Sequence, residues 1–504
     1  MFKRILIANR GEIAVRVIRA CRELGVETVA VFSEADRAAL HVREADYAVA
    51  VGPAPAAQSY LNTERILEAA KQTGAEAIHP GYGFFSENAG FARAVQEAGL
   101  VFIGPPPSAI EQMGDKVEAR KLMAAAGVPV VPGSPGTLER EEEVRDLANK
   151  IGFPIMLKAA AGGGGKGMRL VEYEKDLSSA VRTVASEAKS SFGDGRFYVE
   201  KFVSRPRHIE VQVFADLHGN TVHVFERECS IQRRNQKVVE ESPSPFITPE
   251  MRAEMGAVAV RAARAVNYAG AGTIEFLADA DRNFYFLEMN TRIQVEHAVT
   301  ELVTGVDLVK AQVLVAAGER LPFAQSDLAQ SGWALECRVY AEDPAAGFVP
   351  APGRIDHIKF PDGPGIRVDA GVYAGGEVPI YYDPMIAKLA VWGRDRKEAI
   401  ARMRRALNEF SIAGELTTNL DFHRWLMTHP RFIAGDFDTG FISQEYHPQA
   451  AQDGSDGARL AAILTAALSA RRDTNHTAAA AQPAAGKSAG SPWKTLGRLD
   501  MLRR

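Results

Sequence analysis

From residue 3 to about 112, short apolar segments alternate with amphipathic ones. The segment RILIA is apolar throughout, which is typical of a buried strand, and Ile13, Val17 and Leu24 then recur at helical spacing. Four more apolar segments indicate strands, with helical segments between them, at 28–33, 47–51, 77–81 and 100–104. Strands that alternate with helices predict a parallel sheet covered by helices.

The middle of the chain has a different pattern. One helix is predicted over 108–127, and the Pro- and Gly-rich segment GVPVVPGSPG that follows predicts a hinge. Beyond it we expect an α+β region dominated by antiparallel pairs, with strands at 154–161, 168–173, 196–203, 208–216 and 221–229. Helices are expected at about 174–190 and 249–267, and a hairpin at 273–290.

A third unit is predicted from about Trp333 onward. Its strand-like segments are ALECRVYAE, GRIDHIKF, GIRVDAGV and AKLAVWG, and a helix follows over EAIARMRRALNEF. After about residue 446 the composition changes to a low-complexity tail. The tail ends in SPWKTLGRLDMLRR, whose apolar residues are each three apart, at Trp493, Leu496, Leu499 and Leu502. This segment is either a short docking helix or a frayed end.

Length and charge limit the classes of protein that fit these segments. At roughly 150 residues per domain, 504 residues predict about three domains. A net charge of −4 gives no basic surface for nucleic acid or for an acidic membrane. The three cysteines are too far apart for a disulfide framework or a zinc site. The longest nearly apolar stretch, 461–470, is half of the roughly 20 residues that a membrane span needs. We therefore expect a soluble, cytoplasmic protein.

The glycine-rich segment KAAAGGGGKGMR (158–169) indicates a phosphate-binding turn between two strands. A dinucleotide-binding loop should open a helix, and a P-loop needs Gly-Lys-Ser/Thr, whereas here Lys166 is followed by Gly167 and a strand-like segment. Backbone N–H groups of glycines can close over a phosphate, and Lys158 and Lys166 add positive charge. A flexible hairpin is the alternative.

The segment TIEFLADADRNFYFLEMN (273–290) predicts a hairpin with acidic residues on its strands. With the turn centred near residue 281, Glu275 should lie nearly opposite Glu288, and Asn290 shares the face of Glu288. Two carboxylates and an amide oxygen are a hard, oxygen-only ligand set, which suits Mg²⁺ or Mn²⁺ with bound phosphates. The alternative is a solvated outer face, although opposed like charges are unfavourable without a cation.

Polar residues continue to alternate beyond this hairpin. Glu288, Asn290, Arg292, Gln294 and Glu296 occupy every second position, so an extended stretch would present them along one track. The planar guanidinium of Arg292 suits a carboxylate-like anion, and Glu296 is placed to take a proton from that anion. An exposed polar edge is the alternative.

Three other features are ambiguous when each is taken alone. His208 begins a predicted strand, where a single histidine is usually structural, and Lys116 lies in a helix, where a surface lysine is the default. A basic run is more often a solvated turn than an anion site, and the run 227–237 contains Arg227, Arg233, Arg234 and Lys237.

Seven segments occur together and in order: NRGEIAVRVIRACRELG (9–25), HPGYGFFSENAGFA (79–92), GDKVEARK (114–121), KAAAGGGGKGMR (158–169), RECSIQRRNQKVVEE (227–241), EMNTRIQVEH (288–297) and ECRVYAEDP (336–344). Over residues 1 to about 446, the chain therefore resembles biotin carboxylase, an ATP-grasp enzyme. The resemblance implies ATP-dependent carboxylation of biotin by bicarbonate, the first half-reaction of acetyl-CoA, propionyl-CoA and pyruvate-type carboxylases, including that of fatty acid biosynthesis.

The resemblance also implies a multidomain fold of α/β and α+β classes. The expected units are an N-terminal parallel α/β domain (1–113), an ATP-grasp domain (114–330) with a mobile glycine-rich lid (about 131–203), a β-rich C-terminal domain (331–446) and the tail (447–504).

Roles for individual residues follow from the same resemblance. The 162–167 loop should cover the phosphates of ATP, and the residues expected around ATP are Lys116, Lys158, Gly164, Gly165, Lys166, Glu200, Lys201, Val203, His208, Gln232, Asn235, Glu275 and Glu288. The expected metal ligands are Glu275, Glu288 and Asn290. Bicarbonate is expected at Lys237, Arg292, Gln294 and Val295. Glu296 should be the base, and Arg338 should face the ureido oxygen of biotin.

In the implied mechanism, bicarbonate attacks the γ-phosphorus to give carboxyphosphate, while metal ions and lysines neutralise charge. Loss of phosphate then yields CO₂, the phosphate takes the N1′ proton of biotin, and Arg338 stabilises the enolate-like oxygen. Two positions depart from the family pattern: Asn235 replaces the His of R-R-H-Q-K, and Ala298 replaces the Pro of E-H-P-V-T-E. Because Asn can hydrogen-bond but carries no charge, we expect it to affect nucleotide affinity more than the reaction, and we expect the change at Ala298 to be milder.

No Met-Lys-Met motif occurs in the chain. We therefore expect biotin on a separate carboxyl carrier protein, a separate carboxyltransferase subunit, and 491–504 as a candidate contact segment; a homodimer is expected by family analogy. Two other classes stay open: an ATP-grasp ligase that activates another carboxylate for an amine, and a regulatory subunit that binds ATP without turnover. Arg338 and the stretch from Arg292 to Glu296 favour bicarbonate and biotin.

Overall fold

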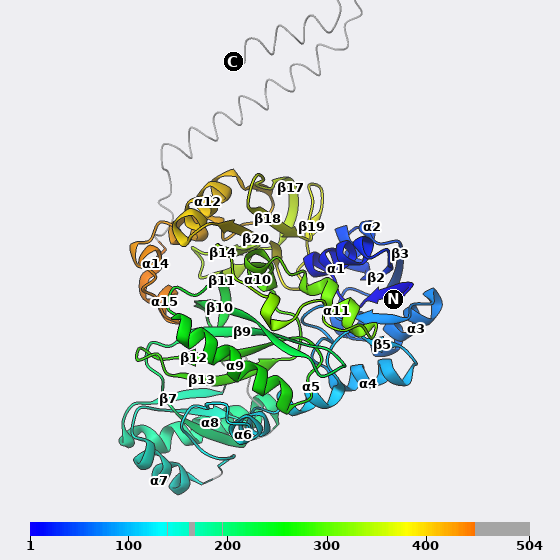
Figure 1. The fold of residues 1–504 in the computed structure, drawn as a ribbon. Coiled ribbons are helices and arrows are strands. Elements are labelled where there is room, and N and C mark those ends of the chain that lie inside the picture. Colours follow the sequence, from blue (N-terminus) through cyan, green and yellow to red (C-terminus); the bar gives the residue numbers. More distant parts are fainter. Residues whose placement is uncertain (139, 161–166, 194, 449–504) are drawn as a thin grey trace, which may run out of the picture. The chain divides into compact units, whose positions relative to one another are not determined.

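The computed structural model describes residues 1–138, 140–160, 167–193 and 195–448. The chain begins with a five-stranded parallel sheet, whose strands are coloured blue in Figure 1. Its order is β3-β2-β1-β4-β5. Its strands are β1 (Arg4–Ile7), β2 (Glu27–Ser33), β3 (Tyr47–Gly52), β4 (Ala77–His79) and β5 (Val101–Phe102). The helices around it are α1 (Gly11–Glu23), α2 (Leu40–Glu44), α3 (Thr63–Thr73) and α4 (Ala89–Glu97). The predicted parallel α/β unit is confirmed, and Ile5 and Leu6 lie in different hydrophobic clusters because β1 is buried on both faces.

The helix predicted over 108–127 is wrong in one respect, because the segment forms two helices. They are α5 (Pro107–Gly114) and α6 (Lys116–Ala125). Between them Asp115 is extended, with φ −89° and ψ 109°, and its carboxylate accepts from the backbone N–H groups of Val117 (2.9 Å) and Glu118 (3.1 Å). Asp115 is thus an N-cap that starts a second helix.

A small antiparallel sheet follows, in the order β7-β6-β8, with its own hydrophobic core. Its strands are β6 (Ile155–Ala159), β7 (Met168–Val171) and β8 (Phe197–Lys201), and its helices are α7 (Glu141–Ile151) and α8 (Leu177–Phe192). The two strands predicted on either side of the glycine-rich turn therefore pair as expected. The turn itself, 161–166, lies outside the described residues.

One antiparallel sheet of eight strands joins the two units predicted separately for the rest of the chain. Its order is β13-β12-β9-β10-β11-β14-β20-β18, and the pairing of β11 with β14 makes it continuous. The strands are β9 (Arg207–Ala215), β10 (Thr221–Arg233), β11 (Gln236–Ser242), β12 (Gly270–Ala278), β13 (Phe284–Asn290), β14 (Trp333–Tyr340), β18 (Ile366–Ala370) and β20 (Met385–Gly393). The packed helices include α9 (Pro249–Ala265), α10 (His297–Thr304), α11 (Leu308–Ala316) and α12 (Arg396–Glu409).

Shorter elements complete the described part. The remaining strands are β15 (Glu342–Asp343), β16 (Val349–Pro350), β17 (Gly353–Lys359), β19 (Glu377–Val378) and β21 (Ser411–Gly414). The remaining helices are α13 (Leu420–Leu426), α14 (Pro430–Ala434) and α15 (Phe441–Glu445), with 3₁₀ turns at Glu34–Asp36, Ala56–Gln58, Glu174–Asp176 and Gln325–Asp327. Within the described ranges, none of the helices combines the length and apolar character that a membrane span requires. The predictions for the tail from 449 onward lie outside the described residues.

Candidate active site

The predicted acidic hairpin is confirmed, and it forms one wall of a polar site. Glu275 of β12 is paired directly with Glu288 of β13. Glu275 is buried, whereas the side chain of Glu288 is 38% exposed and lies 3.3 Å from Lys116 Nζ on α6. The side-chain N–H of Asn290 donates to Glu275 Oε1 at 2.8 Å. The two carboxylates and the amide therefore lie together, as the two-residue period of a strand requires.

The extended track predicted beyond this hairpin is wrong, because β13 ends at Asn290 and 291–296 form no strand. Glu87 accounts for the change of direction: its carboxylate accepts from the backbone N–H of Thr291 (3.0 Å) and from Nε of Arg292 (2.9 Å). The polar groups still meet, since the guanidinium of Arg292 donates to Gln294 Oε1 and Asn290 Oδ1, both at 3.0 Å. The bend, rather than the alternation, brings these side chains together.

Lys237 is the centre of the cluster. Its Nζ contacts Glu210 of β9 and lies 2.7 Å from both Glu275 Oε1 and Glu296 Oε1. Burial would lower the pKa of Lys237, but its three carboxylate partners raise that pKa well above the usual value. Burial would raise the pKa of Glu275, yet Lys237 and His208, whose Nε2 lies 3.0 Å from Glu275 Oε2, lower it. Glu275 is therefore held in its ionised form beside this ammonium.

Glu296 lies between two cations and is fully buried. Its Oε2 accepts from Nη2 of Arg338 at 2.8 Å, while its Oε1 faces Lys237. Burial would raise the pKa of Glu296, but Lys237 and Arg338 hold it well below the usual range. Arg338 in turn donates through Nε to Glu240 Oε1 at 2.6 Å. The result is an ionised carboxylate held in one orientation, next to the acidic hairpin.

Glu240 gives a prediction about pH. Burial, only partly opposed by Arg338, raises the pKa of Glu240 from 4.5 to about 7, and among the described residues its Oε2 has no hydrogen-bond partner. Between these two pH values the unfolded chain loses this proton and the folded chain keeps it, so stability falls as pH rises. In Glu240→Gln the group is neutral at every pH. The Tm of the wild type should therefore fall relative to that of E240Q between pH 5 and pH 8, as measured by scanning calorimetry; a constant difference between the two would contradict the shift.

The residues predicted around a nucleotide make several separate contacts. Lys158 of β6 and Arg120 of α6 both contact Glu200 of β8. On the eight-stranded sheet, Nδ1 of His208 lies 2.8 Å from the side-chain nitrogen of Gln232. Lys201 is different, because its Nζ donates to the backbone carbonyl groups of residues 152 (2.9 Å) and 153 (3.0 Å), and Val203 is half-buried just after β8. Gly164, Gly165 and Lys166 lie outside the described residues.

The basic run 227–237 forms the hairpin that joins β10 to β11. Only the tip of this hairpin is a solvated turn. Arg234 and Asn235 at the tip are exposed, with φ of +51° and +65°. Positive φ at both central positions defines a type I′ turn, in which Asn is favoured. Arg227 is instead fully buried and contacts Glu210. Strand pairing, rather than the composition of the basic run, therefore decides which basic side chains lie in the site.

Three ligand sets among the described residues could hold a metal ion. One is the oxygen set Glu275, Glu288 and Asn290 on the hairpin. A second is His208, Glu210 and Glu275, and a third is Glu210, Cys229 and Glu296; within each of these two, the ligand atoms lie within 4.8 Å of one another. The third set includes a thiol whose pKa burial raises well above its usual value, so it suits a hard cation poorly. The second set includes a nitrogen ligand, and Glu210 is already bound by Lys237 and Arg227. The hairpin set is therefore the better match to the chemistry of Mg²⁺.

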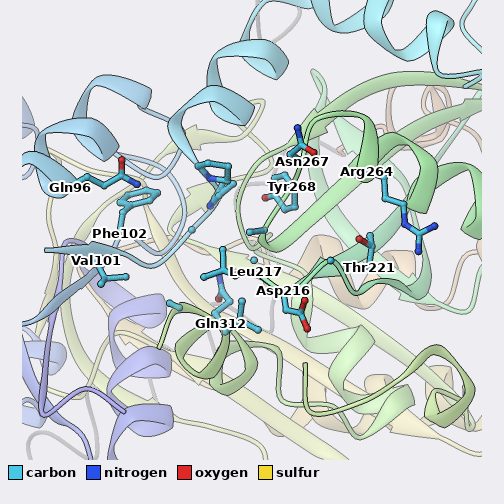
Figure 2. A pocket seen from close by; sticks show the side chains of 18 of the residues that line it. Gln96, Val101, Phe102, Asp216, Leu217, Thr221, Arg264, Asn267, Tyr268 and Gln312 are labelled. Carbon is cyan, nitrogen blue, oxygen red and sulfur yellow. The ribbon is translucent and has the colours of Figure 1, made fainter. Parts of the chain in front are cut away.

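A cavity of about 620 Å³ lies elsewhere, lined by the end of α4, by β5, by the turn between β9 and β10 and by the segment between α9 and β12 (Figure 2). Phe102, Leu217 and Tyr268 form apolar parts of its wall. None of the predicted site residues within the described ranges lines this cavity. Cavity size therefore does not locate the polar site.

Three family models match the chain in order. They are "Biotin carboxylase, N-terminal domain" over 1–110, "Carbamoyl-phosphate synthase L chain, ATP binding domain" over 115–324, and "Biotin carboxylase C-terminal domain" over 336–444. The chain belongs to the biotin carboxylase family.

Relatives within the family are similar over most of the chain. Biotin carboxylase 1 of Bacillus subtilis is 54% identical, over 88% of this chain and 98% of that protein. The propionyl-CoA carboxylase alpha chain of Ruegeria pomeroyi is 52% identical, over 88% of this chain and 68% of that protein. The biotin carboxylase domain dimer of Hydrogenobacter thermophilus 2-oxoglutarate carboxylase, solved with MgADP, ADP and bicarbonate, has a TM-score of 0.84 and 48% identity, and covers 90% of this chain and 100% of that one.

Sequence reasoning missed four residues that contact the site of this family member: Glu87, Arg120, Glu210 and Glu240. Glu210 could have been found, since it alternates with His208 and Gln212 on β9 and so shares their face. Glu240 is 98 residues from Arg338 in the chain, and only the pairing of β11 with β14 brings the two strands together. No local sequence pattern predicts such a contact.

Proposed function

We propose that the chain uses ATP and bicarbonate to carboxylate biotin on a separate carrier protein, by way of carboxyphosphate. The observation that supports this best is the position of Glu296, which is fully buried between Lys237 and Arg338. Glu296 also shares Lys237 with Glu275 of the acidic hairpin. Lys237, the proposed anion-binding cation, is thus in contact with both the proposed base and a proposed metal ligand.

The oxygen ligand set fits a divalent metal. Glu275 and Glu288 are opposed like charges, and their present partners are all cationic or amide N–H groups. We propose that Glu275, Glu288 and Asn290 hold Mg²⁺, or Mn²⁺, together with ATP. When bound, the metal neutralises charge on the phosphate oxygens.

The nucleotide is proposed to bind between the three-stranded sheet β7-β6-β8 and the eight-stranded sheet. The proposed residues are Lys116, Lys158, Glu200, Lys201, Val203, His208, Gln232 and Asn235, with the 162–167 loop over the phosphates. A backbone contact is proposed for Lys201, since its side chain is bonded to carbonyl oxygens. Lys116 and Lys158 then supply charge toward the phosphates, and closure of the lid at about 131–203 excludes water from the intermediate.

Bicarbonate is proposed to bind at Lys237, Arg292, Gln294 and Val295. A bicarbonate ion bound there would share the positive charges of Lys237 and Arg338 with Glu296. Because Glu296 owes its low pKa to those cations, losing part of their charge raises the proton affinity of the carboxylate. Glu296 can then accept the bicarbonate proton, and the resulting oxyanion attacks the γ-phosphorus.

Biotin is proposed to bind at Arg338, whose guanidinium would stabilise the ureido oxygen as the N1′ proton leaves to phosphate. The carrier protein and carboxyltransferase are proposed as separate partners, and the acyl acceptor belongs to the latter. We propose a homodimer, in line with the dimeric Hydrogenobacter domain, and domains over 1–113, 114–330 and 331–446, followed by the 447–504 tail.

An ATPase assay tests the proposed function. With Mg²⁺ present, ADP release should require bicarbonate and should increase when free biotin is added at high concentration. ADP release that ignores bicarbonate would instead favour a ligase for another carboxylate. No turnover under any condition would favour a regulatory ATP-binding protein.

Arg338→Ala separates the two steps of the reaction. The change should lower biotin carboxylation by about 10²–10³, the range for a lost oxyanion donor. Bicarbonate-dependent ATP cleavage should fall less, because Lys237 still contacts Glu296. Carboxybiotin and ADP are measured in the same reaction. An equal loss of both products would mean that Arg338 acts on ATP cleavage alone.

A further inference from the structure

Lys388 of β20 has no role in the proposed mechanism, yet it is a lysine with a fully buried side chain. It is the cross-strand neighbour of Arg338 on β14. Its Nζ donates to the backbone carbonyl of Val295 at 2.7 Å, and lies 3.4 Å from Glu12 Oε1 and 3.7 Å from Asp369 Oδ2. One ammonium thus meets groups from α1, from β18 and from the segment before α10.

A buried lysine is costly unless polar groups surround it. Here the closest partner is neutral, since the carbonyl of Val295 is nearer than either carboxylate. Asp369 has a stronger partner in Arg367, which donates to it at 2.8 Å. Burial would lower the pKa of Lys388, but the carboxylates of Glu12, Glu336 and Asp369 balance the charge of the ammonium and raise that pKa. The carbonyl of Val295 makes its shortest hydrogen bond, at 2.7 Å.

Val295 is one of the four residues proposed to bind bicarbonate. Its carbonyl belongs to the same planar peptide unit as the N–H of Glu296, so fixing that oxygen fixes the direction in which Glu296 leaves the backbone. The segment 291–296 has no strand or helix to hold it, and α10, which follows, packs on β14 and β20 (Figure 1). Lys388 reaches this segment from the sheet underneath.

We propose that Lys388 is a positioning residue for bicarbonate: by holding the Val295 carbonyl, it sets the orientation of Gln294 and Glu296. This inference rests on the proposed function. Loss of the hydrogen bond lets the 292–296 backbone rotate, which misplaces the anion site. ATP binding depends on other elements and stays intact.

The test compares Lys388→Met with Arg367→Met. Arg367 is a matched control, because it lies on the next strand, β18, contacts the same Asp369 and reaches α10 at Glu301, and within the described part of the chain its hydrogen bonds go to these two carboxylates rather than to Val295. Kinetics of ATP cleavage give the KM for bicarbonate and the KM for ATP. Hydrogen–deuterium exchange of the free proteins reports on the backbone amides of 292–297 without any substrate.

In K388M the KM for bicarbonate should rise by about 10- to 100-fold, the range for a lost hydrogen bond to a charged group, while the KM for ATP changes by less than about twofold. Amides of 292–297 should exchange faster than in the wild type. R367M keeps the hydrogen bond from Lys388 to Val295, so it should change the bicarbonate KM and the exchange of 292–297 by much less than K388M does, whatever its Tm. Lys388→Arg, which keeps a donor, should fall between K388M and the wild type, and it replaces K388M if that variant does not fold.

An unchanged bicarbonate KM in a folded Lys388 variant would overturn the proposal, as would parallel increases in both KM values in K388M and R367M. If the wild type itself cleaves ATP without any dependence on bicarbonate, the proposed function fails first. That result is distinct from a failure at Lys388 alone.

Discussion

Replacing Glu296 with Gln should lower bicarbonate-dependent ATP cleavage by about 10²–10⁴, the range for loss of a general base. The amide has nearly the same shape as the carboxylate but cannot take a proton from bicarbonate. The fold should survive, because the two cations that contact Glu296 each keep another carboxylate: Lys237 keeps Glu210, and Arg338 keeps Glu240. The measurement is ADP release at saturating ATP and Mg²⁺, with the Tm as a check on folding.

Glu288→Gln is the matched control, since it makes the same chemical change on the acidic hairpin. E288Q should raise the Mg²⁺ concentration needed for half-maximal activity and leave the KM for bicarbonate close to that of the wild type. A rate in E296Q above about a tenth of the wild-type rate would exclude Glu296 as the base, because only about 1.4 kcal/mol would then separate the two barriers.

The acidic hairpin could be predicted from the sequence because its geometry is local. Two strands joined by a short polar turn have few possible registers, and alternation then decides which side chains share a face. Glu275 opposite Glu288 follows from these two constraints. The parallel sheet at the start of the chain follows in the same way, since apolar strands and amphipathic helices differ in period.

The segment after the hairpin could not be predicted, because its direction depends on a residue far away in the chain. Glu87 bonds to the backbone of Thr291 across 204 residues of sequence, and the strand ends there. Asp115 is a milder case: one continuous helix was predicted through it, and its carboxylate instead caps the start of a second helix. A strand or helix predicted from local pattern ends where a carboxylate side chain accepts hydrogen bonds from the backbone instead.

The contacts between charged residues in the site also could not be predicted without the tertiary structure. Lys237 lies in a basic run that favours a solvated turn, whereas strand pairing surrounds it with acidic residues from β9, β12 and the start of α10. Lys388 is the extreme case: an apolar strand pattern around a lysine gives no indication that its ammonium reaches Val295. Long-range register, which sequence patterns do not encode, decides both contacts.

Lys237→Met should produce the largest combined loss of stability and activity. Methionine fills nearly the same volume without charge, so three buried carboxylates, Glu210, Glu275 and Glu296, lose a shared partner. Removing one member of a buried ion pair costs about 3–5 kcal/mol of unfolding free energy, and a network of this kind should lie in that range. The Tm should fall, and ATP cleavage should drop by about 10²–10³ through loss of the bicarbonate cation.

A second substitution separates charge imbalance from lost packing. Glu210→Gln removes one of the uncompensated carboxylates, so Lys237→Met/Glu210→Gln should regain part of the Tm lost in K237M. Arg227 then loses its ion pair with Glu210 but keeps side-chain hydrogen bonds to Gln212 and Thr300, at 2.7 and 2.9 Å. Activity should not return with the Tm, because bicarbonate still lacks its cation. If the double variant is no more stable than K237M, packing rather than charge sets the stability of the cluster; if activity returns with the Tm, Lys237 serves the fold and not the substrate.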